Sequence, residues 1–437
     1  MAVELNKQVM QAVESQGYRV TVGDVAAKAG LNVEIAQQGL LALASETQAH
    51  MQVSDSGEIA YEFPKNFRSV LRNKYWQLQA QAALMKVWEV LFYIVRISFG
   101  IMLMLSIALI FIAIFALTIA AQSQGGGNSR DDRGGGFGGF YISPFNFFYL
   151  LDFNYGRGRR RYPNRYSGRG PRNSNSGKLN FLEAIFSFLF GDGDPNADLE
   201  ERRWRTIGNV IRNNRGAIAA EQIVPYLDDL GEGWEKEYED YMIPVLSRFN
   251  GQPEVSPAGE MVYYFPELQV SAVERGKASV SAYLKETKRK FTQATSDQVM
   301  MAIGLGSLNI IGALVLQNML QGAVIAGGFV GFVQSIFWLL LGYGIAFLAV
   351  PLVRYYWVQW RNRKIERRND KRAQRAQTVN QLSASIKEKL AFAQQFASQK
   401  VLRADESVYS TESGLLEQEV DRSDQLEAEF RRRLNEI

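Results

Sequence analysis

Two long stretches without a charged residue constrain the fold of this chain more than any other feature. Residues 97–121 form an uncharged run of 25 residues, and residues 298–353 form another of 56 residues. Because roughly 20 apolar residues in a helix cross a bilayer core, the first run predicts one transmembrane helix. The second run is long enough for two helices, and its glycines cluster in residues 321–331. We therefore predict a transmembrane hairpin with helices near 299–320 and 329–353.

Basic residues flank these runs and indicate the orientation of the chain. Residues 65–96 carry six Lys or Arg and a single acid, and further basic residues precede and follow the predicted hairpin. By the positive-inside rule, such basic flanks lie in the cytoplasm. We therefore predict an integral membrane protein whose N- and C-termini are both cytoplasmic.

This orientation requires a return crossing between the first helix and the second half of the chain. The candidate is residues 137–155, an aromatic-rich stretch with Pro144 and Asp152 that is followed directly by several arginines. Its composition also suits an interfacial or re-entrant element, which would leave the flanking regions on opposite faces. Both interpretations of this stretch stay open.

Two twelve-residue strings far apart in the chain are nearly identical. VSDSGEIAYEFP occupies residues 53–64, VSPAGEMVYYFP occupies residues 255–266, and seven of the twelve positions match. Such internal similarity indicates a duplicated unit. The residues that define these two predicted hairpins are Val53, Gly57, Tyr61, Phe63, Pro64, Val255, Gly259, Tyr263, Phe265 and Pro266.

The residues before the first hairpin show helical patterns. Apolar spacing predicts helices at 4–15, 22–29 and 33–45, and Thr21 is a suitable N-cap for the second helix. Residues 21–43 resemble a helix-turn-helix, so with its hairpin the first copy resembles a winged helix.

The second copy fits the same plan with a longer middle. Its predicted helices lie at 204–212, 219–230 and 235–249, and its hairpin follows. The fold class predicted for the chain is therefore mainly α with small β-hairpins, in a multi-pass membrane protein that carries two winged-helix-like modules.

The charge of both copies argues against nucleic acid as the partner. Residues 1–64 contain eight acids and three bases, and residues 205–266 contain ten acids and five bases, so each copy has a net charge of −5. The helix predicted to face a ligand carries Glu34 and no base. Because phosphate binding needs several Lys or Arg residues, we predict that these modules dock proteins. A folded spacer without a partner is the alternative.

A strip of arginines without any acid follows the aromatic stretch. Its members are Arg157, Arg159, Arg160, Arg161, Arg165, Arg169 and Arg172. Arginine interleaved with glycine and tyrosine can bind RNA by charge and stacking, and a basic strip beside a membrane segment contacts anionic lipid or sets topology. Its position favours membrane lipid, and docking on an acidic protein surface also stays open.

Composition excludes several kinds of chemistry. The chain has no cysteine and one histidine, His50, so it lacks thiolate nucleophiles, disulfides and cysteine-held metal clusters. No nucleophile-and-base pair or phosphate loop stands out in the sequence. We therefore predict that the protein is not an enzyme and has no catalytic residue, metal site or cofactor.

Three strings resemble a known family. They are FSFLFGDGDPN at residues 186–196, EERRWRTIG at 200–208 and VYSTESGLLEQE at 408–419. They resemble an uncharacterised membrane-protein family of cyanobacteria and plant chloroplasts, whose plant members are sometimes labelled iron–sulfur cluster biosynthesis proteins. The resemblance implies a plasma or thylakoid membrane. The iron–sulfur label implies cysteine ligands, and because this chain has none the label is not transferred.

The predicted organisation divides the chain into seven segments. In order, they are a first winged-helix-like module at 1–64, a basic connector with the first transmembrane helix at 65–121, a Gly/Arg-rich linker at 122–178, an interfacial helix with the second module at 179–266, a basic connector at 267–297, the transmembrane hairpin at 298–353 and a cytoplasmic helical tail at 354–437.

Three functions fit this organisation. The first is a membrane adaptor, assembly factor or scaffold that presents the two acidic modules for protein docking at the cytoplasmic face. The second is a subunit of a channel or transporter, built by homo-oligomerisation of the glycine-rich hairpin. The third is a membrane-tethered regulator that binds nucleic acid.

Overall fold

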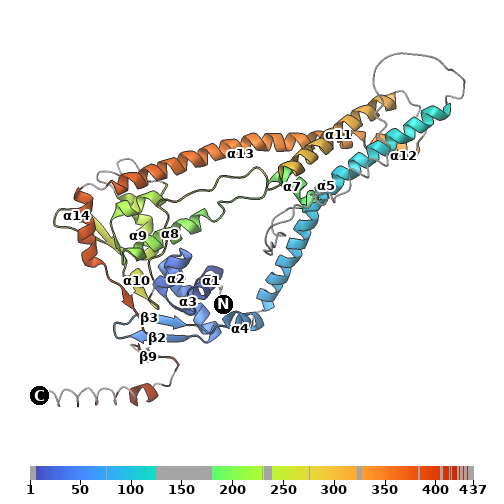
Figure 1. Ribbon diagram of the computed structural model, residues 1–437. Helices are drawn as coiled ribbons and strands as arrows, with labels where there is room; N and C mark the ends of the chain where they lie inside the picture. The colour runs from blue at the N-terminus through green and yellow to red at the C-terminus, as the bar shows by residue number, and fades with distance from the viewer. Residues whose placement is uncertain are drawn as a thin grey trace, which may run out of the picture. The chain divides into compact units, whose positions relative to one another are not determined.

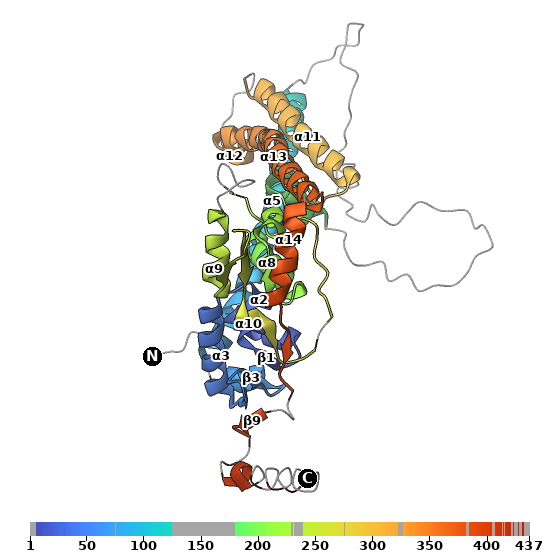
Figure 2. The same ribbon diagram turned by 90° about the vertical axis from the view of Figure 1, so that its left-hand side faces the viewer.

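The computed structural model describes residues 6–74, 76–124, 180–228, 230, 239–274, 276–321, 327–381, 384–403, 407–412, 414, 416–420, 423, 427 and 431. The chain forms two compact units. Unit 1 comprises residues 1–82, 195–288 and 363–437, and unit 2 comprises residues 83–194 and 289–362. The described part is mainly helical with small antiparallel sheets and one parallel strand pair (Figures 1 and 2).

Within unit 1 the same order of elements occurs twice. The first copy consists of α1 (Lys7–Ser15), β1 (Arg19–Thr21), α2 (Val22–Ala29), α3 (Val33–Thr47), β2 (His50–Ser54) and β3 (Ile59–Glu62). The second consists of α8 (Leu199–Asn213), β4 (Ala217–Ile218), η1 (Ala220–Gln222), η2 (Val224–Tyr226), η3 (Asp240–Met242), α9 (Ile243–Phe249), β5 (Gln252–Val255) and β6 (Met261–Tyr264). The sheets have equivalent strand orders, β1-β3-β2 and β4-β6-β5.

Local hydrogen bonds repeat between the copies. The amides of Phe63 and Phe265 each donate to the carbonyl of the residue before the first strand, Tyr18 and Gly216 respectively, at 2.8 Å. Both hairpin turns place a glycine, Gly57 or Gly259, at φ 83°, which favours glycine. The matching strings therefore mark the same backbone geometry in both copies.

The helices of the first copy follow from local sequence, and their prediction is confirmed. Thr21 accepts a hydrogen bond from the amide of Asp24, whose carboxylate accepts one from the amide of Thr21, so a capping box starts α2. Gly30 at φ 68° ends α2 in the left-handed conformation.

In the second copy, one helix prediction is wrong and another is confirmed in its described part. Residues 219–230 were predicted to be one helix, but they contain the short 3-10 segments η1 and η2, because Pro225 interrupts the helical hydrogen bonds. The predicted helix at 235–249 is described only from residue 239, and its regular part is α9 after the short η3.

Unit 1 also contains short elements that follow each copy and a C-terminal arm, defined here as residues 363–412. These elements are α4 (Phe67–Lys74), α10 (Pro266–Gln269), β7 (Val270–Ser271), the end of α13 (Phe337–Asn380), α14 (Ala384–Ala393), η4 (Gln394–Phe396), β8 (Lys400–Val401) and β9 (Ser407–Ser410). The elements up to β7 belong to the first group, and those from the end of α13 onward belong to the arm. The tail that was predicted to be helical contains the expected helices and, in addition, two short strands. β8 pairs in parallel with β7, and β9 adds to the free edge of β2 (Figure 1).

Residues 276–294, all described, lie in the predicted basic connector and contain no helix. Asparagine side chains bind the amide and the carbonyl of single residues along this segment. Asn213 binds Ala278 in this way, Asn369 binds Glu286 and Asn196 binds Thr287, at 2.8–2.9 Å. These contacts satisfy backbone groups that a helix would otherwise pair internally.

Unit 2 contains α5 (Trp76–Gln124) from residue 83, α7 (Phe181–Phe190), α11 (Ser296–Gln321), α12 (Gly328–Ser335) and α13 up to residue 362. Three described helices are long and apolar enough to cross a membrane, at Ala83–Ala121, Ser296–Gln321 and Phe337–Val379. The predicted second arm of the hairpin is divided at Ile336 between α12 and α13. The aromatic stretch 137–155 lies outside the described residues.

Two polar contacts organise the apolar interior of unit 2. Arg354 Nη2 donates to the carbonyls of Ser187 and Phe188 at the end of α7 and to that of Phe291, at 2.6–3.1 Å. A cation at a helix C-terminus compensates the unpaired carbonyls and the helix dipole. Between α5 and α11, buried Asn309 donates to Ser106 at 2.6 Å.

Candidate functional site

The two copies of unit 1 pack against each other through α2 and α8. Asp24, which is fully buried, forms an ion pair with Arg212 at 2.7 Å and accepts a hydrogen bond from the amide of Ala272 at 2.9 Å. The helices approach closely because Gly208 lies against Ala27, where a Cβ would come within 2.9 Å of the Ala27 Cα. The copies therefore share one hydrophobic core.

The third helices of both copies leave apolar side chains exposed. Ile35 and Leu41 on α3 and Ile243 on α9 are 49%, 45% and 61% exposed. Asn32 at the start of α3 donates to the Ser247 carbonyl of α9 at 3.3 Å, and Figure 2 shows the two helices on the same side of unit 1. We name the group Glu34, Ile35, Gln38, Leu41 and Ile243 the third-helix surface.

Part of the acidic charge of the second copy, together with that of Glu286, pairs with basic residues of the arm. Arg372 on α13 is 1% exposed, forms ion pairs with Asp228 and Glu286, and donates to the Leu284 carbonyl at 2.9 Å. Burial by itself raises the pKa of Glu286, but the hydrogen bonds and charges of Arg368 and Arg372 outweigh burial and lower it. The basic arm therefore neutralises acids that the sequence assigned to an external surface.

A second buried cation lies where α14 meets the second copy. Lys389 is 5% exposed and donates to Glu221 at 2.9 Å and to Glu239 at 2.5 Å. Burial by itself lowers the pKa of Lys389, but attraction to Glu221 and the bonds to Glu239 outweigh burial and raise it. The Tyr263 hydroxyl donates to Glu239 at 2.6 Å, so this hairpin residue belongs to the cluster.

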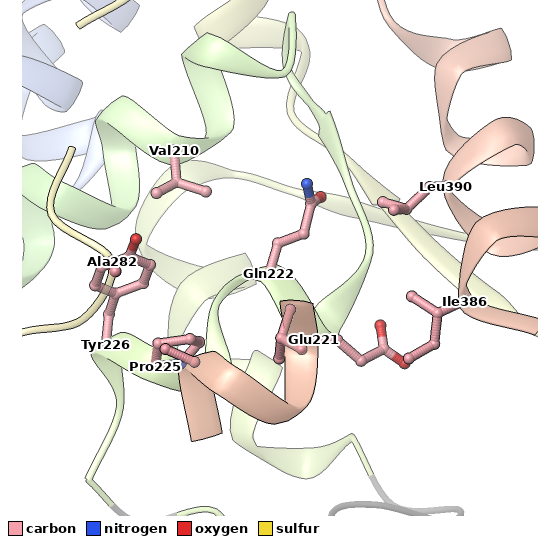
Figure 3. A pocket seen from close by; sticks show the side chains of 10 residues that line it. Val210, Glu221, Gln222, Pro225, Tyr226, Ala282, Ile386 and Leu390 are labelled. Atoms are coloured by element: carbon pink, nitrogen blue, oxygen red, sulfur yellow. The ribbon is translucent and has the colours of Figure 1, made fainter. Parts of the chain in front are cut away.

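A cavity of about 290 Å³ adjoins this cluster (Figure 3). Its lining comes from α8, η1, η2 and residue 282 on one side and from α13 and α14 on the other. The lining residues are Val210, Glu221, Gln222, Pro225, Tyr226, Ala282, Ala376, Val379, Ile386 and Leu390. Figure 3 shows Ile386 and Leu390 on α14 facing the residues of the second copy. Its lining is both polar and apolar, and the polar side chains are those of Glu221, Gln222 and Tyr226.

The end of the arm attaches to the first copy. Lys400 forms an ion pair with Glu58 at 2.9 Å, and Arg19 donates to the Leu402 carbonyl at 2.6 Å. Burial raises the pKa of Glu58, but hydrogen bonds from Ser56, Lys400 and Ser54 outweigh burial and lower it to about 2. The arm therefore contacts both copies in turn.

The predicted hairpin residues fall into two groups in the structure. Their aromatic members are core residues, because Tyr61, Phe63, Tyr263 and Phe265 are at most 3% exposed. The remaining positions form the turns and ends of the hairpins, where Val255 is 60% exposed and Pro266 starts α10. These residues maintain the fold of the copies rather than forming one surface.

The predicted lipid-contact arginines all lie outside the described residues. They are Arg157, Arg159, Arg160, Arg161, Arg165, Arg169 and Arg172. Among the residues that are described, no group of three His, Asp or Glu side chains could hold a metal ion.

Sequence reasoning missed Arg372, Lys389 and the cavity. The opposite charges of the acidic copies and the basic arm were the available signal, but charge alone does not say which residues meet. The four-residue spacing of Ile386 and Leu390 is typical of one face of a helix. The sequence does not indicate what this face packs against, because the second copy contributes residues from the separate elements α8, η1 and η2.

Comparisons with known proteins give one relative and no solved structure. The chain is 36% identical over 433 residues to Uncharacterized protein At5g03900, chloroplastic, from Arabidopsis thaliana, a match that covers 96% of this chain and 81% of that protein. No family model matches the chain. No solved structure matches it either.

Proposed function

The chain belongs to the family of the chloroplastic Arabidopsis protein, and from this premise we propose that it is an integral-membrane adaptor or assembly factor. Two winged-helix-like modules would hold protein partners at the cytoplasmic face of the membrane. The chloroplastic relative and the three candidate spans support a photosynthetic membrane, either thylakoid or plasma. The proposal rests mainly on the third-helix surface.

The element order supports the winged-helix assignment. Each copy runs from a helix through a short strand, helical segments and a third helix to a two-stranded hairpin, and the first strand joins the sheet beside the last. In helix-turn-helix proteins the recognition helix contacts nucleic acid. Here the equivalent α3 has no Lys or Arg, and its exposed positions include Glu34, Ile35 and Leu41.

This composition favours a protein partner over nucleic acid. Phosphate contacts require basic side chains, whereas protein interfaces bury apolar side chains at their centre and surround them with polar ones. Ile35, Leu41 and Ile243 would supply such a centre, and Glu34 and Gln38 would supply part of the rim. A partner with an apolar patch and basic surroundings is complementary.

Unit 1 is built from three separate stretches of the chain, and this supports termini on one side of the membrane. It gathers residues before α5, residues between α7 and α11, and residues after the transmembrane part of α13. A compact unit of this kind favours an even number of crossings between residues 82 and 195. The candidate for the return crossing is 137–155, and the following arginines would then contact lipid on the same face.

Single cysteines test this topology, because the chain has none of its own. We expect Ser45→Cys, Val255→Cys and Gln381→Cys to react alike with a membrane-impermeant maleimide in sealed, oriented vesicles. Gln321→Cys at the end of α11 should show the opposite accessibility. Opposite labelling of Ser45→Cys and Val255→Cys would place the copies on different faces and contradict the topology.

Charge introduced on the third-helix surface tests the docking function. We expect the double variant Ile35→Glu/Leu41→Glu to lose crosslinked partners at least tenfold in native membranes, because central interface residues contribute about 2 kcal/mol or more. Quantitative mass spectrometry of the crosslinked full-length protein measures the loss.

The matched control is Val255→Glu, which also introduces an acid at a well-exposed aliphatic position of unit 1. It should retain the partners that the double variant loses. Equal recovery of partners by both variants would refute docking through the third helices. Recovery of only the free wild-type protein would refute the adaptor function itself.

A further inference from the structure

The helix α5 is longer than one membrane crossing requires. Its apolar part, Ala83–Ala121, has 39 residues. At 1.5 Å per residue this is about 58 Å, roughly twice the thickness of a bilayer core. The uncharged run 97–121 is itself long enough for one crossing. Residues 84–95 therefore extend beyond the hydrocarbon region by about three turns of helix, in the basic flank that is predicted to be cytoplasmic.

This extension of α5 is apolar and exposed. Among residues 84–95 only Lys86 and Glu89 are charged. The others are large hydrophobic residues with exposed fractions of 42–67%, namely Leu84, Met85, Val87, Trp88, Val90, Leu91, Phe92, Tyr93, Ile94 and Val95. By contrast, ten of the fifteen residues 361–375 of α13 are charged. Because soluble surfaces rarely expose so continuous an apolar patch, we infer that a further contact covers this part of α5.

The exposed residues of α5 follow a heptad repeat along one face. Steps of three and four residues connect Leu84, Val87, Leu91, Ile94, Ser98, Ile101, Leu105, Ala108, Ile112, Phe115 and Ile119, all exposed except the half-buried Ala108. We name this row the heptad stripe. The buried residues Leu103, Ile107 and Ile110 lie on the opposite face and pack in the cores of unit 2. Heptad spacing is the pattern by which helices wind around one another in a coiled coil.

The charged residues of the extension lie away from the heptad stripe. When Leu84 is position a of the heptad, Lys86 is at position c and Glu89 at position f. Arg96 is at f as well, and it pairs with Asp192 of the same chain at 3.5 Å. Positions c and f face away from the neighbouring helix in a coiled coil. Two identical copies can therefore meet along the stripe without bringing like charges together.

The residue types on the stripe suit a contact between equal helices. Position a is leucine in three of the first four heptads, and position d is valine or isoleucine in the first three. Parallel coiled coils with leucine at a and isoleucine at d favour three or four helices. Copies of one chain have the same orientation in a membrane, so their α5 helices would run in parallel.

We propose that copies of this chain associate in parallel through the heptad stripe of α5, and that residues 84–95 continue this contact beyond the bilayer. The oligomer would carry one third-helix surface per copy, so it would bind a partner with several matching sites more tightly than a single copy. The inference goes beyond the adaptor function and concerns a different surface of the protein.

Disulfide crosslinking in native membranes tests the contact, because the chain has no cysteine of its own. Under mild oxidation we expect Leu91→Cys and Ile94→Cys to give a product of twice the 49.3 kDa chain mass. Glu89→Cys and Tyr93→Cys, at positions f and c of the same turns, are the matched controls. They should give about tenfold less product, because a disulfide needs facing Cβ atoms about 4 Å apart.

A charge on the stripe tests whether the contact holds the oligomer together. We expect the purified full-length wild type in mild detergent to be larger than one chain by light scattering. Leu91→Arg should reduce the oligomer at least tenfold, because it buries a charge without a partner, and Tyr93→Arg should not. Leu91 and Tyr93 are 49% and 45% exposed, so both variants should keep the thermal midpoint of the wild type.

Three results would overturn the proposal. They are equal crosslinking at stripe and control positions, a wild-type protein that is monomeric in both membranes and detergent, or an oligomer that Leu91→Arg leaves intact. Equal crosslinking would mean that lipid covers residues 84–95 and that copies meet only by collision. Partner crosslinking through the third-helix surface is measured separately, so failure of the α5 contact leaves the adaptor function standing.

Discussion

Replacing Arg372 with methionine is expected to destabilise the attachment of the arm to the second copy by about 3–5 kcal/mol, the usual cost of removing one partner from a buried ion pair. Arg372 is 1% exposed and bridges Asp228 and Glu286. Methionine preserves much of the side-chain length but leaves Glu286, which is 4% exposed, with Arg368 as its remaining ion-pair partner among the described residues. Hydrogen exchange of residues 284–286 and 363–380 measures the change.

Lys288→Met is the matched control for this variant. Lys288 pairs with Glu366, but both side chains are about half exposed, at 58% and 47%. Exposed pairs contribute about 0–1 kcal/mol, so the control should change exchange only slightly. Equal effects of the two substitutions would mean that the buried position of Arg372 is incorrect.

Gly23→Ala is expected to have a similarly large effect on the contact between α2 of the first copy and α10, which follows the second copy. A Cβ at Gly23 in α2 would lie 1.9 Å from the backbone oxygen of Glu267 and 2.8 Å from its carbonyl carbon. Because a backbone atom cannot rotate away as a side chain can, α2 and α10 would have to separate. We expect a loss of about 3 kcal/mol or more, measured by thermal unfolding and by exchange in residues 266–272.

Gly39→Ala provides the comparison, because it makes the same substitution in a helix of the same unit. Its Cβ would lie 2.8 Å from Val9 Cγ2, and the three nearest atoms all belong to the Val9 side chain, so a side chain rather than a helix has to shift. Alanine also favours the helix by about 1 kcal/mol over glycine, so this variant should destabilise the protein much less than Gly23→Ala. A Gly23→Ala protein as stable as Gly39→Ala would show that the copies do not pack through α2 and α10.

The elements of the first copy were predictable because their signals are local. Thr21 and Gly30 mark the ends of α2, and the turn at Gly57 needs the left-handed backbone that glycine adopts readily. The helices at Ser296–Gln321 and Ala83–Ala121 were predictable for a similar reason, since length and lack of charge within one segment decide whether a helix can cross a bilayer.

The connector and the arm were not predictable in this way. Residues 276–294 have a composition that allows a helix, yet side chains from distant elements, such as Asn213 and Asn369, bind their backbone groups and hold them extended. β9 is a short strand that pairs only with the free edge of β2, more than three hundred residues earlier in the chain. This pairing depends on the path of the arm in the folded protein, which the local sequence does not specify.

The candidate site was predictable only in part. The lack of Lys and Arg in α3 and the exposure of this helix could be inferred from the sequence of the first copy alone. The cavity could not, because Glu221 lies more than 160 residues before Ile386 and Lys389 and meets them only when the arm packs on the second copy. The excess of acidic over basic residues in the second copy could be counted in the sequence, but the ion pairs that Arg372 and Lys389 form with some of these acids could not be predicted from it.

The sequence by itself determined the duplication, the apolar helices and the acidic character of both copies, because each depends on residues close together in the chain. Only the tertiary structure decided that the copies share a core and that the basic arm covers the second copy. Burial and pairing depend on segments brought together from opposite ends of the chain. Their energies are therefore set by the folded arrangement and not by local composition.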